Sequence, residues 1–198
     1  MEPAVLRDDM VDSLEHESKG CVHSETVSVA MRAVPRHEFV DDERGAYADR
    51  AFERFGTRVL APSTAGRLLE AVDSEPDDSV LVVGAGVGYT AAVLAEIVGD
   101  RSVQAVDITR RLVYEARENL ASAGYGGVLV DRRDGAEGFP EYAPYDRVLL
   151  ELVEGEQADT VERNRTRRED REFAQRDARR RKGWELDWID WDGEPRTR

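Results

Sequence analysis

The chain has 198 residues, 40% of them hydrophobic and 35% charged, and its formal net charge at pH 7 is −14. This length suits one domain with a core of ordinary size, and the lack of any run of about 18 apolar residues argues against a membrane-spanning helix. The single cysteine, Cys21, excludes an internal disulfide bond.

Two helices are predicted near the N-terminus. Apolar residues recur at helical spacing over residues 5–14. The second helix is predicted to begin after Ser24, whose hydroxyl can cap it. It is predicted to end at Val34, because Pro35 disfavours helix in the residue before it.

A third helix is predicted over residues 65–72. The chain from residue 41 to this helix is polar and reads as irregular structure. Ser63 or Thr64 is expected to cap the helix through its hydroxyl group. The turn-rich stretch "SEPDDS" then separates this part from the next.

From residue 80 the pattern changes to alternating strands and helices. Short apolar runs predict strands, and longer stretches with one apolar face predict helices. The strands are predicted at 80–83, 102–106, 128–130 and 147–150, and the helices at 89–98 and 110–123. This order predicts an α/β protein with a parallel, Rossmann-like sheet and flanking helices.

The segment "VLVVGAGVGYTAAVLAEIVG" joins the first strand to its helix through closely spaced glycines. Gly84, Gly86 and Gly88 allow a sharp turn and let a ligand approach the backbone. The start of the helix adds free N–H groups and the positive end of the helix dipole. A dinucleotide-binding turn needs a glycine where this chain has Tyr89, so a mononucleoside ligand with a carboxylate fits better than a pyrophosphate.

Acidic residues follow the next two strands at the same predicted edge. Asp107 ends the second strand and can accept hydrogen bonds from both hydroxyl groups of a ribose. Asp134, in "RRDGAEG" after the third strand, can accept a hydrogen bond from an adenine amino group. Each aspartate alone has a plainer interpretation as a turn residue or helix cap. Together with the glycines they indicate S-adenosylmethionine as the ligand.

These motifs resemble those of the protein-L-isoaspartate O-methyltransferases. "AMRAVPRHEFV" at 30–40 is similar to the family's N-terminal signature, and the glycine segment is similar to its first cofactor motif. "RDGAEGFPEYAPYDRVLL" resembles the family's acidic turn and the strand that follows it. The likeness covers roughly residues 5–150. It implies a class I methyltransferase fold and methyl transfer from S-adenosylmethionine to the free carboxylate of isoaspartyl residues in damaged proteins.

The resemblance also assigns roles to residues and regions. Residues 1–78 are expected to form a helical region on the substrate side and 79–152 the cofactor-binding core. For 153–198, beyond the likeness, the run of charged residues predicts a charged, helical tail. The implied cofactor contacts are Gly84, Ala85, Gly86, Gly88 and Tyr89 at the amino-acid end, Asp107 and Ile108 at the ribose and adenine face, and Asp134 and Gly135 at the adenine edge.

One departure from the family pattern concerns catalysis. The family carries a serine in "GQTISAP", close to the transferred methyl group, whereas this chain reads "GTRVLAPST" and has Leu60 there. A leucine side chain cannot hydrogen-bond a carboxylate. Ser63 or Thr64 is the candidate substitute, and Arg58 is expected to be a surface residue rather than a partner of the substrate carboxylate.

A second departure is the length of the sheet. The last strands of the family are not evident after "YDRVLL", so the strand at 147–150 is expected to form an exposed edge. The tail, a partner subunit or the tryptophan segment (Trp184, Trp188 and Trp191) is expected to cover it, and self-association is one such route. Loss of an internal segment is the other interpretation of the shortened sheet. Both departures leave a second hypothesis open, a cofactor-binding but non-catalytic regulatory or scaffold protein.

The composition also predicts the cellular compartment, the salt conditions and the kinds of ligand of the protein. The acidic, polar N-terminus and the single cysteine predict a cytoplasmic protein, in which Cys21 packs rather than reacts or binds metal. Only two lysines accompany the acidic surface, which suggests adaptation to high salt. The three histidines are scattered, so no metal site is expected. The ten basic residues of 163–182 are interleaved with four acidic ones, so nucleic-acid binding is not expected.

Overall fold

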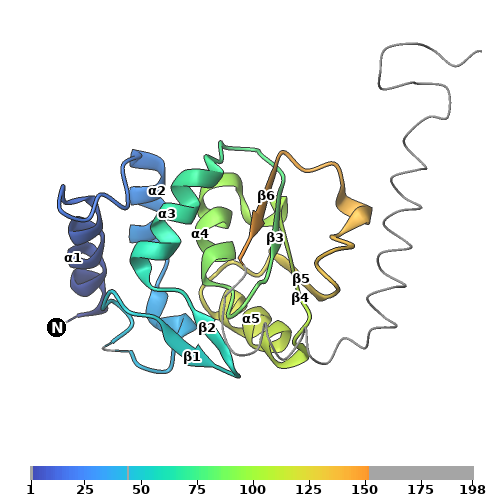
Figure 1. The fold of residues 1–198 in the computed structure, drawn as a ribbon, viewed down its shortest axis with the longest axis horizontal. Helices are drawn as coiled ribbons and strands as arrows, with labels where there is room; N and C mark the ends of the chain where they lie inside the picture. Colours follow the sequence, from blue (N-terminus) through green and yellow to red (C-terminus); the bar gives the residue numbers. More distant parts are fainter. Residues whose placement is uncertain (1, 44, 152–198) are drawn as a thin grey trace, which may run out of the picture. The chain divides into compact units, whose positions relative to one another are not determined.

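The computed structural model describes residues 2–43 and 45–151. Its centre is a four-stranded parallel sheet with the order β5-β4-β3-β6. The strands are β3 (Val80–Val83), β4 (Val103–Asp107), β5 (Leu129–Arg132) and β6 (Arg147–Leu150). Figure 1 shows the sheet beside a layer of helices. No helix among the described residues is long and apolar enough to cross a membrane.

Helices cover one face of the sheet and a loop covers the other. The helix α3 (Pro62–Val72) packs against β6, α4 (Tyr89–Val98) packs against β3 and β4, and α5 (Arg110–Ser122) packs against β4 and β5. On the opposite face, Leu81, Val83 and Val106 pack against Phe139. The apolar runs of β3 and β4 are therefore buried on both sides, as is typical of parallel strands.

The N-terminal helices form an outer layer on the helical side. α1 (Pro3–Glu15) packs on α2 (Glu25–Ala33), and α2 packs on α4. Figure 1 shows α4 lying between the sheet and these helices. Ser24 caps α2 as predicted, because its hydroxyl accepts a hydrogen bond from the Val27 amide. The described residues also contain three short 3₁₀ helices, η1 (Arg36–Phe39), η2 (Asp100–Ser102) and η3 (Pro140–Tyr142).

The stretch predicted as irregular contains a β-hairpin instead. Strands β1 (Phe52–Arg54) and β2 (Thr57–Val59) pair antiparallel around a two-residue turn. Both turn residues have positive φ, 48° at Phe55 and 77° at Gly56. Such turns match the twist of a hairpin, but a phenylalanine in this conformation is unusual, and the sequence interpretation therefore missed it.

The prediction that Ser63 or Thr64 caps the third helix was wrong. The helix begins at Pro62, and Ala61 is the N-cap without a side-chain hydrogen bond. Proline suits the first helical position because it has no N–H to leave unpaired and its φ is already helical. Ser63 therefore lies inside α3, where its backbone amide donates to Asp49 Oδ1 at 3.0 Å.

One hydrophobic core joins the N-terminal helices to the sheet. Leu14 of α1 and Met31 of α2 belong to the same buried cluster as Val82 and Leu149 of the sheet. The described residues, 2–43 and 45–151, accordingly belong to one compact unit. Cys21 is buried and free, in the packing position predicted for it.

The predicted edge strand is present. β6 pairs with β3 on one side, and within the described residues no strand pairs with its other side. Val148 and Leu150 are exposed on the face that the loop covers elsewhere. The charged tail and the tryptophan segment lie outside the described residues.

Candidate functional site

The glycine turn after β3 is held against β4 by backbone hydrogen bonds. The amides of Gly84 and Ala85 both donate to the carbonyl of Val106, at 2.8 and 3.0 Å. Gly84, Gly86 and Gly88 all have positive φ, at 95°, 53° and 95°. The turn thus uses glycine for its backbone conformation at every one of these positions.

The three glycines differ in what lies where a side chain would be. A Cβ at Gly84 would lie 2.3 Å from the Glu151 carbonyl oxygen, and one at Gly88 would lie 3.2 Å from Leu120 Cγ. A Cβ at Gly86 would meet only the Gly84 carbonyl oxygen, 4.0 Å away. Gly86 is therefore the glycine with room for a ligand on its backbone, whereas Gly84 and Gly88 admit neighbouring protein atoms.

Asp107 lies at the end of β4 and holds this turn. Its Oδ2 accepts from the Gly86 amide at 3.1 Å, and its Oδ1 accepts from the Thr109 amide at 2.7 Å. The residue is 9% exposed, whereas its neighbour Ile108 is 51% exposed. The carboxylate retains lone pairs for further donors, and Ile108 offers an apolar surface beside it.

Asp134 and Gly135 lie at the same edge of the sheet as Asp107. β4 and β5 are adjacent parallel strands, and the Arg133 amide donates to the Asp107 carbonyl at 3.1 Å. Asp134 is exposed, and its Oδ1 accepts from the Ala136 amide at 2.9 Å. A Cβ at Gly135 would lie 2.2 Å from Val83 Cγ1, so this glycine lets the loop pack on β3.

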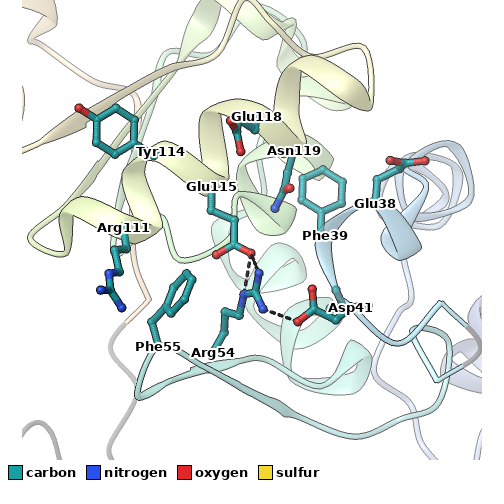
Figure 2. Close-up of a pocket in the computed structure, with 11 residues that line it drawn as sticks. Glu38, Phe39, Asp41, Arg54, Phe55, Arg111, Tyr114, Glu115, Glu118 and Asn119 are labelled. Carbon is teal, nitrogen blue, oxygen red and sulfur yellow. Dashed lines mark hydrogen bonds and ion pairs between the residues drawn. The ribbon is translucent and has the colours of Figure 1, made fainter.

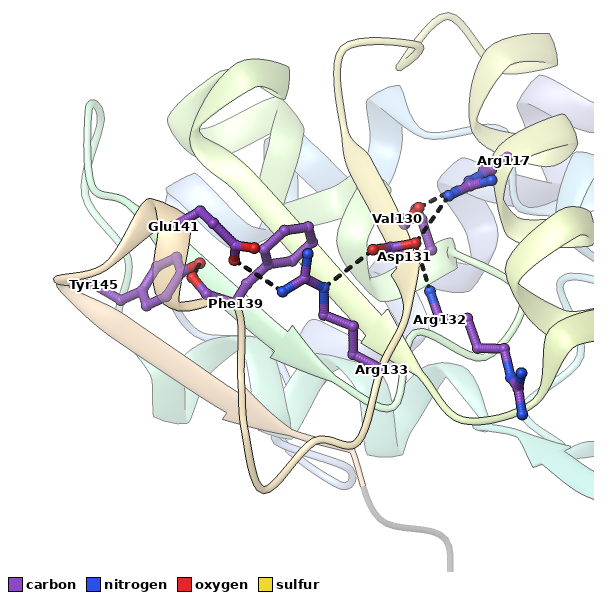
Figure 3. A network of polar contacts seen from close by, with 8 residues as sticks. All are labelled: Arg117, Val130, Asp131, Arg132, Arg133, Phe139, Glu141 and Tyr145. Atoms are coloured by element: carbon purple, nitrogen blue, oxygen red, sulfur yellow. Dashed lines mark hydrogen bonds and ion pairs between the residues drawn. The ribbon is translucent and has the colours of Figure 1, made fainter. Parts of the chain in front are cut away.

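An ion-pair network anchors the loop that carries Asp134. Arg133 donates to Asp131 at 3.0 Å and to Glu141 at 2.8 Å, as Figure 3 shows. The Arg133 guanidinium also lies over the Phe139 ring, 4.0 Å from its centroid. The hydrogen bond from Arg133 is the main cause that lowers the pKa of Asp131. The network ties the start of the loop to its far end.

The turn sits where the order of the strands reverses. β4 and β5 lie on one side of β3, while β6, which follows them in sequence, lies on the other. In open α/β sheets the crevice outside the carboxyl ends of the strands at such a point is where ligands bind. Gly84 at the end of β3 and Glu151 after β6 flank this point.

Tyr89 begins α4 but is buried beneath the turn. The Arg36 guanidinium lies over its ring, 4.4 Å from the centroid, and Phe39 contacts the ring edge-on. Arg36 is fully buried and donates to the carbonyls of Ala46 at 2.9 Å and Leu60 at 2.5 Å. The sequence interpretation missed Arg36, because a lone arginine in a polar stretch carries no periodic signal.

A small cavity of about 10 Å³ lies beside Gly86. Leu60 and Gly86 both line it, so the structure brings the family's serine position next to the glycine turn. Arg58 lines it as well, with an exposed side chain, as the sequence predicted. Ser63 is not among its lining residues and hydrogen-bonds Asp49 instead.

Glu151 also lines this cavity, and the sequence gave no sign of it. Its Oε2 atom is buried without a hydrogen-bond partner. Burial raises the pKa of this carboxyl group to about 7, and the Thr90 hydroxyl and the Arg36 guanidinium oppose that rise. A position after the last predicted strand looked like the start of the charged tail, which hid its buried environment.

A larger pocket of about 400 Å³ lies elsewhere, between the hairpin and α5. Figure 2 shows Arg54 at its base, between Asp41 and Glu115. Arg54 Nε donates to Glu115 Oε1 at 2.6 Å, and this hydrogen bond is the main cause that raises the pKa of Arg54. None of the predicted cofactor contacts lines this pocket.

Comparisons with known proteins place the chain in a family. The family model of protein-L-isoaspartate(D-aspartate) O-methyltransferase matches residues 7–157. The protein-L-isoaspartate O-methyltransferase of Aeropyrum pernix is 46% identical over 147 residues, which make up 71% of this chain and 55% of that protein.

Solved structures agree with this result. One named protein-L-isoaspartate O-methyltransferase is similar with a TM-score of 0.65 and 26% identity, over 74% of this chain and 48% of that one. A putative protein-L-isoaspartate O-methyltransferase from Plasmodium falciparum, solved with S-adenosyl-L-homocysteine, has a TM-score of 0.63 at 16% identity, over 73% of this chain and 72% of that one, and so shares the fold. The chain spans about half the length of the A. pernix relative and of the first of these structures.

Proposed function

Because the chain belongs to the protein-L-isoaspartate O-methyltransferase family, we propose that it transfers a methyl group from S-adenosylmethionine to the carboxylate of isoaspartyl residues in damaged proteins. The observation that carries the proposal is the open backbone of Gly86 beside the carboxylate of Asp107, at the point where the strand order reverses. Nothing among the described residues favours the non-catalytic alternative.

The residues present fit S-adenosylmethionine. Gly86 leaves its backbone open, Asp107 can accept hydrogen bonds from the ribose, and the exposed Ile108 can cover one face of the adenine. Asp134 would take the adenine amino group from the neighbouring loop. When bound, S-adenosylmethionine supplies an electrophilic methyl group on a positively charged sulfur. The P. falciparum protein, solved with the demethylated product, supports the same choice of ligand.

The task of the protein in this reaction is positioning. A carboxylate is already anionic at neutral pH, so no general base is needed to activate it. The rate depends on holding the acceptor in line with the methyl group and on keeping water out. Leu60 beside Gly86 provides an apolar wall for that purpose, and the buried Arg36 fixes the backbone of Leu60 through its carbonyl.

The surroundings of the protein are part of the proposal. The net charge of −14 with only two lysines supports a protein that works at high salt, and the free, buried Cys21 supports a reducing, cytoplasmic compartment. Isoaspartyl-containing proteins or peptides are the proposed partners. Self-association with a second copy through the open side of β6 is proposed from the exposed Val148 and Leu150.

A methyl-transfer assay tests the function. The full chain is incubated in high salt with S-adenosylmethionine carrying a labelled methyl group and with an isoaspartyl peptide. A peptide of the same sequence with normal aspartate is the matched control. Label on the isoaspartyl peptide alone is expected. Binding of S-adenosylhomocysteine without any transfer would favour a non-catalytic role, and no binding would overturn both.

A further inference from the structure

The cavity beside Gly86 holds an acidic group that the proposed function does not yet use. Its walls come from the start of η1, from β2 and the residue after it, from the glycine turn, from the start of α4 and from the residue after β6. Glu151 Oε2 is buried in this setting without a hydrogen-bond partner. Buried polar atoms are nearly always paired, so an unpaired carboxyl oxygen beside a ligand site indicates a missing partner.

The protonation state of Glu151 decides what that partner is. Although the residue as a whole is half-buried, its carboxyl group is enclosed, and desolvation raises its pKa to about 7. The Asp107 carboxylate acts in the same direction. A carboxyl group that keeps its proton is a hydrogen-bond donor, whereas an ionised one only accepts. Around neutral pH Glu151 can therefore donate to an anion.

The charges around Glu151 favour an anionic partner. Two of the neighbouring side chains are cationic, and the hydroxyl groups nearby are neutral. Arg36 from η1, Thr90 from α4 and Asp107 from β4 act on the carboxyl group directly. Arg58 from β2 and Tyr89 from α4 line the same cavity. Arg36 also has one guanidinium nitrogen, Nη1, buried without a hydrogen-bond partner. An incoming carboxylate would meet a donor and a positive charge together.

We propose that Glu151 hydrogen-bonds the methyl-accepting carboxylate of the substrate. It thereby supplies the hydrogen bond that the apolar Leu60, at the family's serine position, cannot make. The inference rests on the proposed function. The cavity of about 10 Å³ has room for about one oxygen atom. One substrate oxygen enters it and accepts the hydrogen bond from Glu151, while the other stays outside it, free to attack the methyl group. Leu60 lies on the same cavity and covers the pair from water. Ionisation of Glu151 would set two negative carboxylates against each other and weaken substrate binding.

Two substitutions separate hydrogen bonding from charge. Glu151→Gln keeps a donor and cannot titrate, while Glu151→Leu removes the donor and keeps the bulk. Glu115→Gln is the matched control, because Glu115 Oε2 is likewise buried and unpaired but lies in the other pocket. Affinity for an isoaspartyl peptide is measured by calorimetry on protein saturated with S-adenosylhomocysteine, and KM and kcat by methyl transfer, both from about pH 6 to about pH 8.5.

The unmodified protein is expected to lose at least about tenfold in peptide affinity across this range, because the substrate carboxylate stays ionised while Glu151 loses its proton. Glu151→Gln is expected to bind the peptide with little pH dependence. Glu151→Leu is expected to bind it about 10- to 100-fold more weakly at about pH 6. Affinity for S-adenosylhomocysteine stays within about twofold in both variants, which shows that the site still folds.

The outcomes distinguish this inference from the function on which it rests. An active protein whose Glu151→Leu variant binds the peptide normally, or whose Glu151→Gln variant keeps the original pH profile, overturns the role of Glu151 and leaves the function intact. A protein that binds S-adenosylhomocysteine but neither binds nor methylates the peptide overturns the function, and the role of Glu151 with it.

Discussion

The guanidinium carbon of Arg36 lies 4.4 Å from the centroid of the Tyr89 ring, and both side chains are buried. Arg36 belongs to the segment after α2, and Tyr89 opens α4. The same guanidinium donates to the carbonyls of Ala46 and Leu60. One side chain therefore fixes the N-terminal region, the wall of the cavity and the start of the cofactor-side helix relative to one another.

Arg36→Met is expected to destabilise the fold by roughly 2–5 kcal/mol, because two buried carbonyl groups lose their donor. Urea unfolding followed by circular dichroism measures the effect. Arg110→Met is the matched control, since Arg110 also lies over a tyrosine ring, that of Tyr114, but on the surface. An equal loss in both variants would contradict the structural role given to Arg36.

Gly84→Ala and Gly124→Ala separate steric contact from backbone strain. The two glycines have nearly the same φ, 95° and 93°. A Cβ at Gly84 meets the Glu151 carbonyl at 2.3 Å, whereas one at Gly124 meets nothing within 4 Å. Gly124→Ala is expected to cost about 1 kcal/mol from strain, and Gly84→Ala at least about 2 kcal/mol more from the displaced chain. Equal unfolding midpoints would contradict the close contact between Gly84 and Glu151, the residue after β6.

Asp107→Ala is expected to weaken binding of S-adenosylhomocysteine by about 1–3 kcal/mol, because charge-assisted hydrogen bonds to the ligand and to the Gly86 amide are lost together. Calorimetry measures it. Asp100→Ala is a close control, since Asp100 accepts a hydrogen bond from the Gly127 amide at 3.0 Å, near the opposite ends of the strands. The control is expected to keep its affinity, and a matching loss there would remove Asp107 from the site.

Stability is expected to depend on pH through Glu151. The pKa of Glu151 is raised from 4.5 to about 7 in the folded chain. Between these values the unfolded chain releases a proton that the folded chain keeps. The free energy of unfolding therefore falls as the pH rises through this window, by at most about 3 kcal/mol. The free energy of unfolding of Glu151→Gln is expected to rise relative to that of the unmodified protein over the same range. A constant difference between the two unfolding curves from about pH 5 to about pH 8 would argue against the burial of this carboxyl group.

Salt is expected to stabilise the protein. At a net charge of −14, like charges on the surface repel one another at low ionic strength, and added salt screens this repulsion. The unfolding temperature in about 2 M KCl is therefore expected to exceed that in dilute buffer. Full stability in dilute buffer would count against adaptation to high salt.

The sequence predicted the regular part of the fold closely. Residues 80–83, 89–98 and 147–150 have the predicted bounds, because the apolar pattern is clear there and glycine marks three of the six ends. The hairpin was missed because its strands are short and half-polar and its turn puts Phe55 at positive φ. The start of α3 was misplaced because a hydroxyl cap was preferred to Pro62.

The site was predicted in outline but not in its buried part. The glycine turn, Asp107 and Asp134 lie at one edge because they end adjacent parallel strands, and that follows from the pattern alone. Arg36 and Glu151 come from segments far apart in the sequence, and only packing brings them to one cavity. Charged residues are almost never fully buried, so composition gave no reason to expect them there.

The common hydrophobic core has a mechanical consequence. Leu14 and Met31 pack into the same cluster as the strands that carry the glycine turn, so the first and second halves of the described chain share one interior. Each half contributes buried apolar residues to this cluster and would expose them if the other half were removed. A chain cut at residue 78 would give two fragments that each expose core residues. We expect these fragments to associate with each other rather than to fold independently.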